Sequence, residues 1–192
     1  MGNNDFAAAS RCRQTDSILL AIDLQVRLGA AMPSKVLTRV VRNSALLASS
    51  SALLDVPVIS TEQYPRGLGP TLEEVTAVLP SSTQCFEKTA FSCAGAEGFQ
   101  SALDQLHRRQ IVIVGMEAHV CVLQTAIDLS EAGLEVFVVE DAICSRRLEN
   151  YQNSLERLRQ CGVSIVSAES VVFEWLGDAT HEHFKSIQAL LP

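Results

Sequence analysis

The stretch IVIVGMEAHVCVLQTA, residues 111–126, decides the fold class of this chain. Its first four residues are all β-branched and apolar, which is typical of a buried strand in a parallel sheet. Gly115 ends that run, and from His119 onward apolar residues recur at the spacing of a helical turn. A strand that leads directly into a helix indicates an α/β protein with a parallel sheet.

Cys121 lies in this stretch where the helix begins. Unpaired backbone N–H groups and the helix dipole favour an anion at a helix N-terminus, so we expect a lowered pKa for the Cys121 thiol. Open α/β sheets bind their ligands at the carboxyl ends of the strands, which is where this thiol would lie. Cys121 is therefore a candidate nucleophile, and the alternative is a buried structural thiol.

Apolar strands and amphipathic helices alternate along the rest of the chain. This pattern predicts a three-layer α/β/α Rossmann-like sandwich with a mostly parallel six-stranded sheet. The expected strands are residues 17–23, 56–61, 83–86, 111–114, 134–139 and 163–166. The expected helices are residues 33–54, 71–75, 96–109, 119–132, 149–160 and 169–191. We expect a polar N-terminal segment at residues 1–16 and a single domain at residues 17–192.

The composition narrows the classes of partner. The 15 Lys and Arg against 22 Asp and Glu give a net charge of −7, and the basic residues are dispersed, which disfavours nucleic-acid binding. No apolar run is long enough to span a bilayer, so no membrane partner is expected. Six cysteines without zinc-finger or C-x-x-C spacing predict free thiols, and the polar start of the chain predicts no secretory signal. We expect a cytoplasmic protein; Arg11 and Arg13 leave a mitochondrial transit peptide as the alternative.

Two more polar residues lie at predicted strand ends. Asp23 ends the first strand and Lys88 follows the third. The first and fourth strands are neighbours in the common doubly wound order, so Asp23 and Cys121 should project from adjacent strands. A carboxylate beside a thiol can accept its proton, and a nearby ammonium favours both anions. The alternatives are an Asp23 that caps a turn and a Lys88 that is a solvated loop residue.

At these residues the chain resembles the isochorismatase-like cysteine hydrolases, over about residues 17–174. The segments that carry the resemblance are AIDLQ (21–25), the Lys88 segment with Ser92 behind it, GMEAHVCV (115–122) and DAICSR (141–146). The resemblance implies a catalytic triad of Asp23, Lys88 and Cys121. Asp23 would take the thiol proton, Lys88 would hold Asp23 in place, and Cys121 would attack a carbonyl or imidate-like carbon to form a covalent intermediate.

The resemblance also implies the surroundings of the triad. The oxyanion would bind the backbone N–H groups of Glu117 and Cys121, and a cis peptide bond would join Met116 to Glu117. His119 is close enough to be a base, but Asp23 has that role in the family, so we expect His119 to line the pocket. Gln63 and Phe91 are expected to line it as well. The other cysteines are expected to be core or near-core residues: Cys85, Cys93, Cys144 and Cys161.

One segment departs from part of this family. The nicotinamidase branch has an Asp-x-His…His metal site after the second strand, whereas residues 61–70 read TEQYPRGLGP and contain no histidine. The chain therefore resembles the branch of isochorismatase-domain-containing proteins, and neither a metal nor an organic cofactor is implied. The implied activity is cysteine-dependent hydrolysis of a small molecule at an amide-type C–N bond. The implied assembly is a homo-oligomer, with the apolar C-terminal segment as a contact surface.

Two other functions stay open from the residues. The first is a non-catalytic isochorismatase-like binding or scaffold protein, although such a protein need not keep all three triad residues. The second is a nuclease or another phosphoryl-transfer enzyme. That activity needs a metal-binding carboxylate cluster or a glycine-rich phosphate loop, and the sequence pattern shows neither.

Overall fold

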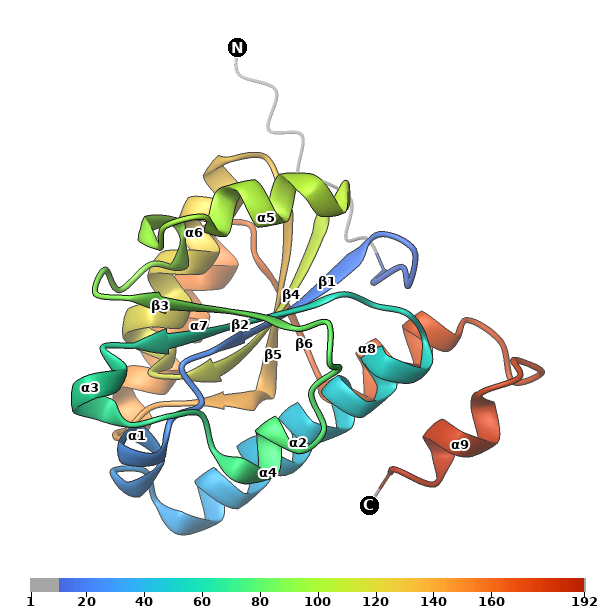
Figure 1. The fold of residues 1–192 in the computed structure, drawn as a ribbon, viewed down its shortest axis with the longest axis horizontal. Coiled ribbons are helices and arrows are strands. Elements are labelled where there is room, and N and C mark those ends of the chain that lie inside the picture. The colour runs from blue at the N-terminus through green and yellow to red at the C-terminus, as the bar shows by residue number, and fades with distance from the viewer. Residues whose placement is uncertain (1–10, 192) are drawn as a thin grey trace.

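A six-stranded parallel sheet forms the centre of the molecule (Figure 1). The structure, a computed structural model, describes residues 11–191. The strand order is β3-β2-β1-β4-β5-β6, and every neighbouring pair is parallel. The strands are β1 (Ser17–Ile22), β2 (Val58–Gln63), β3 (Gln84–Lys88), β4 (Gln110–Met116), β5 (Glu135–Cys144) and β6 (Ser164–Val166). The predicted fold class is confirmed.

Helices cover both faces of this sheet, as Figure 1 shows. One layer contains α2 (Ser34–Leu53), α4 (Glu73–Thr76), α8 (Ala168–Leu176) and α9 (Phe184–Gln188). The other layer contains α5 (Phe99–Leu106), α6 (Leu123–Glu131) and α7 (Leu148–Gln160). Short helical turns complete the connections: α1 (Val26–Ala30), α3 (Pro65–Leu68), the 3₁₀ turn η1 (Cys93–Gly95) and the π-helical turn η2 (Ala118–Val122).

Side-chain alternation along the strands explains why both faces are apolar. In β1, Leu19 and Ala21 join the core under α2 and α8, while Ile18, Leu20 and Ile22 join the core under α5 and α6. Successive side chains of a strand point to opposite faces, so a central strand covered on both sides must be apolar throughout. The uninterrupted apolar runs in the sequence are a direct consequence of this two-sided burial.

The C-terminal region differs from the single helix predicted for residues 169–191. Gly177 ends α8 with φ of 68°, a left-handed conformation that glycine adopts at low cost, and α9 begins only at Phe184. Trp175 is 3% exposed and its indole N–H donates to Ser17 Oγ at 3.0 Å. Much of the apolar surface of this segment is therefore used inside the same chain, while Phe173 stays 39% exposed.

The N-terminal boundary lies partly outside the described residues, which begin at Arg11. The division at residues 16 and 17 stays a prediction. Cys12 N donates to Glu174 Oε2 at 2.7 Å, and Arg13 N donates to Gln110 Oε1 at 2.7 Å, so the chain just before β1 packs on the domain. Among the helices of residues 11–191, none has the length and apolar character needed to cross a membrane.

The cysteines divide between core and surface. Four cysteines are buried: Cys12, Cys93, Cys121 and Cys144. The burial of Cys93 and Cys144 was expected. Cys85 and Cys161 are exposed, so their expected burial was wrong. Cys85 lies on the edge strand β3, which has a neighbour on one side only, and Cys161 lies just after α7. Neither position has an element packed over it that could bury the thiol.

Candidate active site

Asp23 follows β1 and is completely buried. Its φ of 51° is left-handed, and its backbone N–H donates to Thr61 O at 3.1 Å. The Asp23 Oδ1 atom accepts a hydrogen bond from Thr61 Oγ1 at 2.8 Å. Thr61 lies on β2 opposite Ile22, so the neighbouring strand holds both the backbone and the carboxylate of Asp23.

Lys88 is the last residue of the edge strand β3, and its side chain reaches across β2 to Asp23. The Lys88 Nζ atom lies 2.7 Å from Asp23 Oδ2, and neither side chain is exposed. Nζ also donates to Gln63 Oε1 at 2.7 Å and to Phe91 O at 3.0 Å. An ammonium has three N–H donors, so these acceptors can use all of them. Removing either member of such a buried ion pair leaves an uncompensated charge.

Gln63 and Phe91 both contact Lys88, which sequence reasoning did not anticipate. Gln63 lies at the end of β2; its Oε1 accepts from Lys88, and its Nε2 donates to Thr89 O at 2.8 Å. The Gln25 side chain pairs with the Gln63 backbone at 2.8 and 3.0 Å. The Phe91 ring is 53% exposed while its carbonyl accepts from Lys88. Contact of Gln63 or Phe91 with a substrate stays a prediction.

Cys121 lies in η2, between β4 and α6, and is 4% exposed. Burial raises the pKa of the Cys121 thiol to about 12; the nearby Asp23 charge and a hydrogen bond to Asp23 act in the same direction, and the Lys88 charge opposes them. The expected lowering of this pKa was therefore wrong. The sequence argument considered only the helix dipole, whereas burial beside a carboxylate dominates in the folded chain.

The raised pKa gives a prediction for chemical modification. We expect iodoacetamide to alkylate Cys121 with a rate that rises about tenfold per pH unit between pH 7 and 10, because only the thiolate reacts and a pKa of about 12 leaves the thiol mostly protonated there. Peptide-resolved mass spectrometry measures this rate. Free cysteine, with a pKa of about 8.5, is the reference and should level off near pH 9. A plateau for Cys121 below pH 9 would show that the folded thiol ionises more easily.

Glu117 makes the turn that leads from β4 into η2. Its φ is 58°, a left-handed conformation, and no peptide bond within residues 11–191 is cis. The expected cis bond between Met116 and Glu117 is therefore absent, and that expectation was wrong. A left-handed residue costs about 1–2 kcal/mol, whereas a cis bond before a residue other than proline costs about 3–4 kcal/mol. The left-handed Glu117 provides the change of direction at the lower cost.

His119 has polar neighbours in Glu117, in Ser145 of the loop after β5, and in Asn150 of α7. Its Nδ1 lies 3.0 Å from Ser145 Oγ and 3.3 Å from Glu117 Oε2, and its Nε2 lies 3.2 Å from Asn150 Nδ2. Arg146 Nε lies 2.5 Å from Glu117 Oε1, which pairs that buried carboxylate. Both ring nitrogens of His119 therefore have polar neighbours, consistent with a fixed orientation. Contact with a substrate stays a prediction.

Thr61 and Arg146 are the residues of this region that sequence reasoning missed. The signal for Thr61 would have been the β1–β2 register, which pairs Thr61 with Ile22, next to Asp23. That register is a tertiary property. In the described part of the chain, no group of three or more His, Cys, Asp or Glu side chains is placed to hold a metal ion.

Residues 17–170 match the isochorismatase domain family. This chain belongs to the isochorismatase family. It is 39% identical over 186 residues to isochorismatase domain-containing protein 2 of Danio rerio, covering 96% of this chain and 91% of the relative. The chain therefore has the isochorismatase-family hydrolase fold, and the family resemblance predicted from the strand-end segments is confirmed.

Two solved structures have closely similar folds. The MAR1 ribonuclease of Caenorhabditis elegans has a TM-score of 0.89 and 34% identity, covering 95% of this chain and 92% of that one. The YcaC gene product of Escherichia coli, described as an octameric hydrolase of unknown specificity, has a TM-score of 0.86 and 22% identity, covering 95% and 89%. At 22% identity the second likeness concerns the fold alone.

Proposed function

We propose that this protein is a cysteine-dependent hydrolase of a small molecule, acting at an amide-type C–N bond. The observation that carries the proposal is the buried contact of 2.7 Å between Lys88 Nζ and Asp23 Oδ2, near the buried Cys121 thiol, whose pKa the Asp23 charge raises. A buried carboxylate that is fixed by an ammonium and a hydroxyl and lies near a thiol is arranged to accept the thiol proton.

In the proposed first step, Cys121 Sγ forms a bond to the amide carbon while its proton moves to Asp23. The thiol is protonated at rest, so proton transfer accompanies attack rather than preceding it. The oxyanion binds the backbone N–H groups of Glu117 and Cys121. When the C–N bond breaks, Asp23 gives the proton to the leaving nitrogen. An amine departs and a thioester remains on Cys121.

In the second step, a water molecule attacks the thioester carbon and gives its proton to Asp23. The C–S bond then breaks, the acid product leaves, and the proton returns to the Cys121 sulfur. The net reaction consumes one amide and one water and yields one carboxylic acid and one amine. The buried Lys88 ammonium, 2.7 Å from Asp23 Oδ2, offsets the charge of the carboxylate whenever Asp23 has given up its proton.

The test is a screen of small amides with wild type and Cys121→Ala. We expect wild type to hydrolyse at least one amide and to accumulate an acyl adduct on Cys121, seen by intact mass after acid quenching. Cys121→Ala should lose the adduct and lower kcat/KM by about 10⁴-fold or more, since the nucleophile is removed. Cys161→Ala, which removes an exposed thiol, is the matched control and should keep full activity. Turnover that survives in Cys121→Ala contradicts the proposal.

RNA hydrolysis is the second candidate function, because the C. elegans neighbour at 34% identity is named a ribonuclease. The net charge of −7 opposes it, since phosphate-backbone binding needs clustered cations. Adding a labelled RNA to the same screen separates the two: we expect no cleavage, and cleavage that needs Cys121 would favour the ribonuclease. A scaffold protein would turn over neither substrate.

We also propose that the chain forms a homo-oligomer. Val26, Tyr64 and Phe91 follow β1, β2 and β3 at the carboxyl edge of the sheet and are 46%, 55% and 53% exposed. A second copy would bury this apolar surface. Light scattering coupled to gel filtration should therefore give a multiple of the 20.8 kDa chain mass. Replacing Tyr64 and Phe91 by serine should shift the mass toward the monomer, and a wild-type monomer contradicts this part of the proposal.

A further inference from the structure

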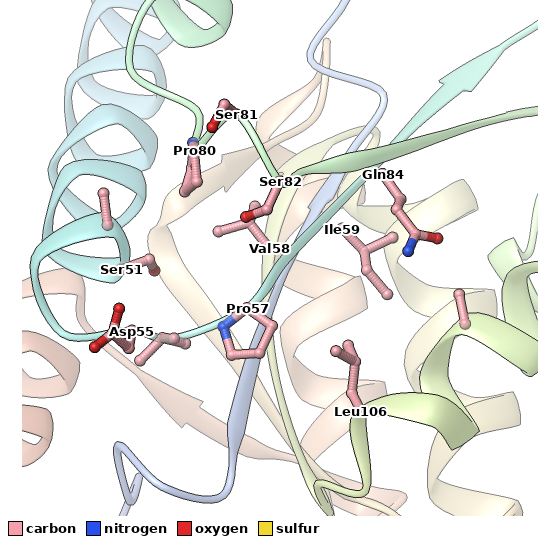
Figure 2. A pocket seen from close by; sticks show the side chains of 13 residues that line it. Ser51, Asp55, Pro57, Val58, Ile59, Pro80, Ser81, Ser82, Gln84 and Leu106 are labelled. Atoms are coloured by element: carbon pink, nitrogen blue, oxygen red, sulfur yellow. The ribbon is translucent and has the colours of Figure 1, made fainter.

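A small cavity lies over the carboxyl end of β5, where α2 and α7 both begin. Its volume is about 120 Å³, and none of Asp23, Lys88 and Cys121 lines it. Three apolar side chains line part of the wall, and the polar groups come from Arg39, Cys144, Ser145 and Tyr151. This cavity is distinct from the groove of about 680 Å³ at the opposite edge of the sheet, which Ser51, Asp55 and Val58 line in Figure 2.

Arg39 gives the small cavity a positive charge. Its Nε atom is buried and has no hydrogen-bond partner, and none of the ion pairs found within residues 11–191 includes Arg39. Burial raises the pKa of Cys144 to about 12 and also raises that of Tyr151, while the Arg39 charge opposes both increases. The field of the guanidinium therefore acts on the groups that line the cavity.

The two helices that begin here add to this charge. The N-cap residue of α2 is Pro33 and that of α7 is Arg147, and neither cap has a side-chain hydrogen bond to the helix. Unpaired N–H groups at a helix N-terminus favour anions. Three nearby carboxylates already have partners: Glu117 pairs with Arg146, Glu140 lies 3.8 Å from Arg159, and Asp141 Oδ1 accepts from Ala168 N at 2.8 Å. Glu149, in the first turn of α7, is solvent-exposed.

The rest of the wall selects the kind of anion. Pro33, Val36 and Leu148 are apolar, and Leu148 is 63% exposed at the rim. Ser145 Oγ lies 3.0 Å from His119 Nδ1, and a hydroxyl that accepts from the imidazole can still donate its own hydrogen. A cavity of about 120 Å³ has room for about four water molecules, so the ligand has only a handful of heavy atoms.

We propose that this cavity binds a short-chain aliphatic carboxylate. The carboxylate pairs with the Arg39 guanidinium and accepts the Ser145 hydroxyl, and the alkyl chain packs on Val36 and Leu148. The site is independent of the Asp23–Lys88–Cys121 centre, so it stands or falls separately from the proposed hydrolase activity.

The test titrates ¹⁵N-labelled protein with sodium butyrate at pH 7 and constant ionic strength, following the amide signals of Ser145 and Leu148. We expect saturable shifts. Butyramide, which has the same chain without the charge, and inorganic phosphate, which has the charge without the chain, should each bind at least about tenfold more weakly. If butyramide binds as tightly as butyrate, the proposed recognition of the charge is overturned. If phosphate binds as tightly as butyrate, the proposed packing of the alkyl chain is overturned.

Variants locate the site. Arg39→Gln should weaken butyrate binding about tenfold or more, whereas Arg39→Lys, which keeps the charge, should retain more of it. Lys35→Gln removes a charge from the exposed face of the same helix and should leave the affinity unchanged. The ¹⁵N spectrum of each variant shows whether it is folded. Wild-type affinity in a folded Arg39→Gln, or equal losses in Arg39→Gln and Lys35→Gln, overturns the proposal.

Discussion

Replacing Gly115 by alanine is expected to lower the free energy of unfolding by about 3–6 kcal/mol. Gly115 has φ of 146°, and a Cβ atom at this position would lie 2.2 Å from the backbone oxygen of Ile22. That oxygen belongs to the last residue of β1, which is paired with Gly115 in the sheet. Because backbone rather than a flexible side chain is in the way, β1 or β4 must shift.

The same change should also damage the candidate active site. Asp23 follows Ile22 directly, so a displaced end of β1 moves the carboxylate away from Lys88. Gly133→Ala is the matched control, since Gly133 also has a positive φ of 86° but no atom within 4 Å of a built Cβ. It should cost about 1 kcal/mol from backbone conformation alone. Denaturant unfolding measures both, and equal costs for the two variants would contradict the close approach at Gly115.

Replacing Lys88 by methionine is expected to cost about 3–5 kcal/mol of unfolding free energy and to abolish hydrolysis. The Asp23 carboxylate would keep its hydrogen bond from Thr61 but lose the ammonium 2.7 Å away. A buried charge without its partner pays the desolvation cost without compensation. Chemical denaturation and the amide assay measure the two effects.

A double substitution separates loss of the pair from loss of packing. Asp23→Asn combined with Lys88→Met should recover much of the stability, since no buried charge is left, but none of the activity. Lys35→Met removes an exposed lysine from α2 and should change the stability by less than about 0.5 kcal/mol. A cost below about 1 kcal/mol for Lys88→Met would show that Asp23 is compensated by other groups.

Much of the fold could be predicted because its signals are local. The apolar run at residues 111–114 marks a strand buried on both faces, and it is the core of β4. The residues at which strands and helices end were less predictable. β4 continues through Gly115 to Met116, because a glycine that faces the close backbone of Ile22 belongs inside the sheet. α8 stops at Gly177, a break that apolar periodicity alone did not show.

The candidate site was predictable as a set of residues but not as a charged environment. Asp23, Lys88 and Cys121 each lie at or just beyond a strand end, and the usual strand order places β1 beside β4. Lys88 lies two strands from Asp23, and only the packed structure shows its Nζ crossing β2. The pKa of Cys121 had the opposite direction to that expected, because burial depends on what packs over a residue.

The sequence alone determined the order of strands and helices, their apolar faces and the three polar residues at strand ends. These features follow from hydrophobic periodicity and turn residues, which act between near neighbours in sequence. Tertiary structure alone decided which oxygen Lys88 binds, that Thr61 holds Asp23, and that the Cys121 thiol stays protonated. These properties arise from contacts between residues 38 to 98 positions apart in the chain, since Thr61 minus Asp23 is 38 and Cys121 minus Asp23 is 98. Desolvation and Coulomb energies depend on such distances in space, which local sequence patterns do not contain.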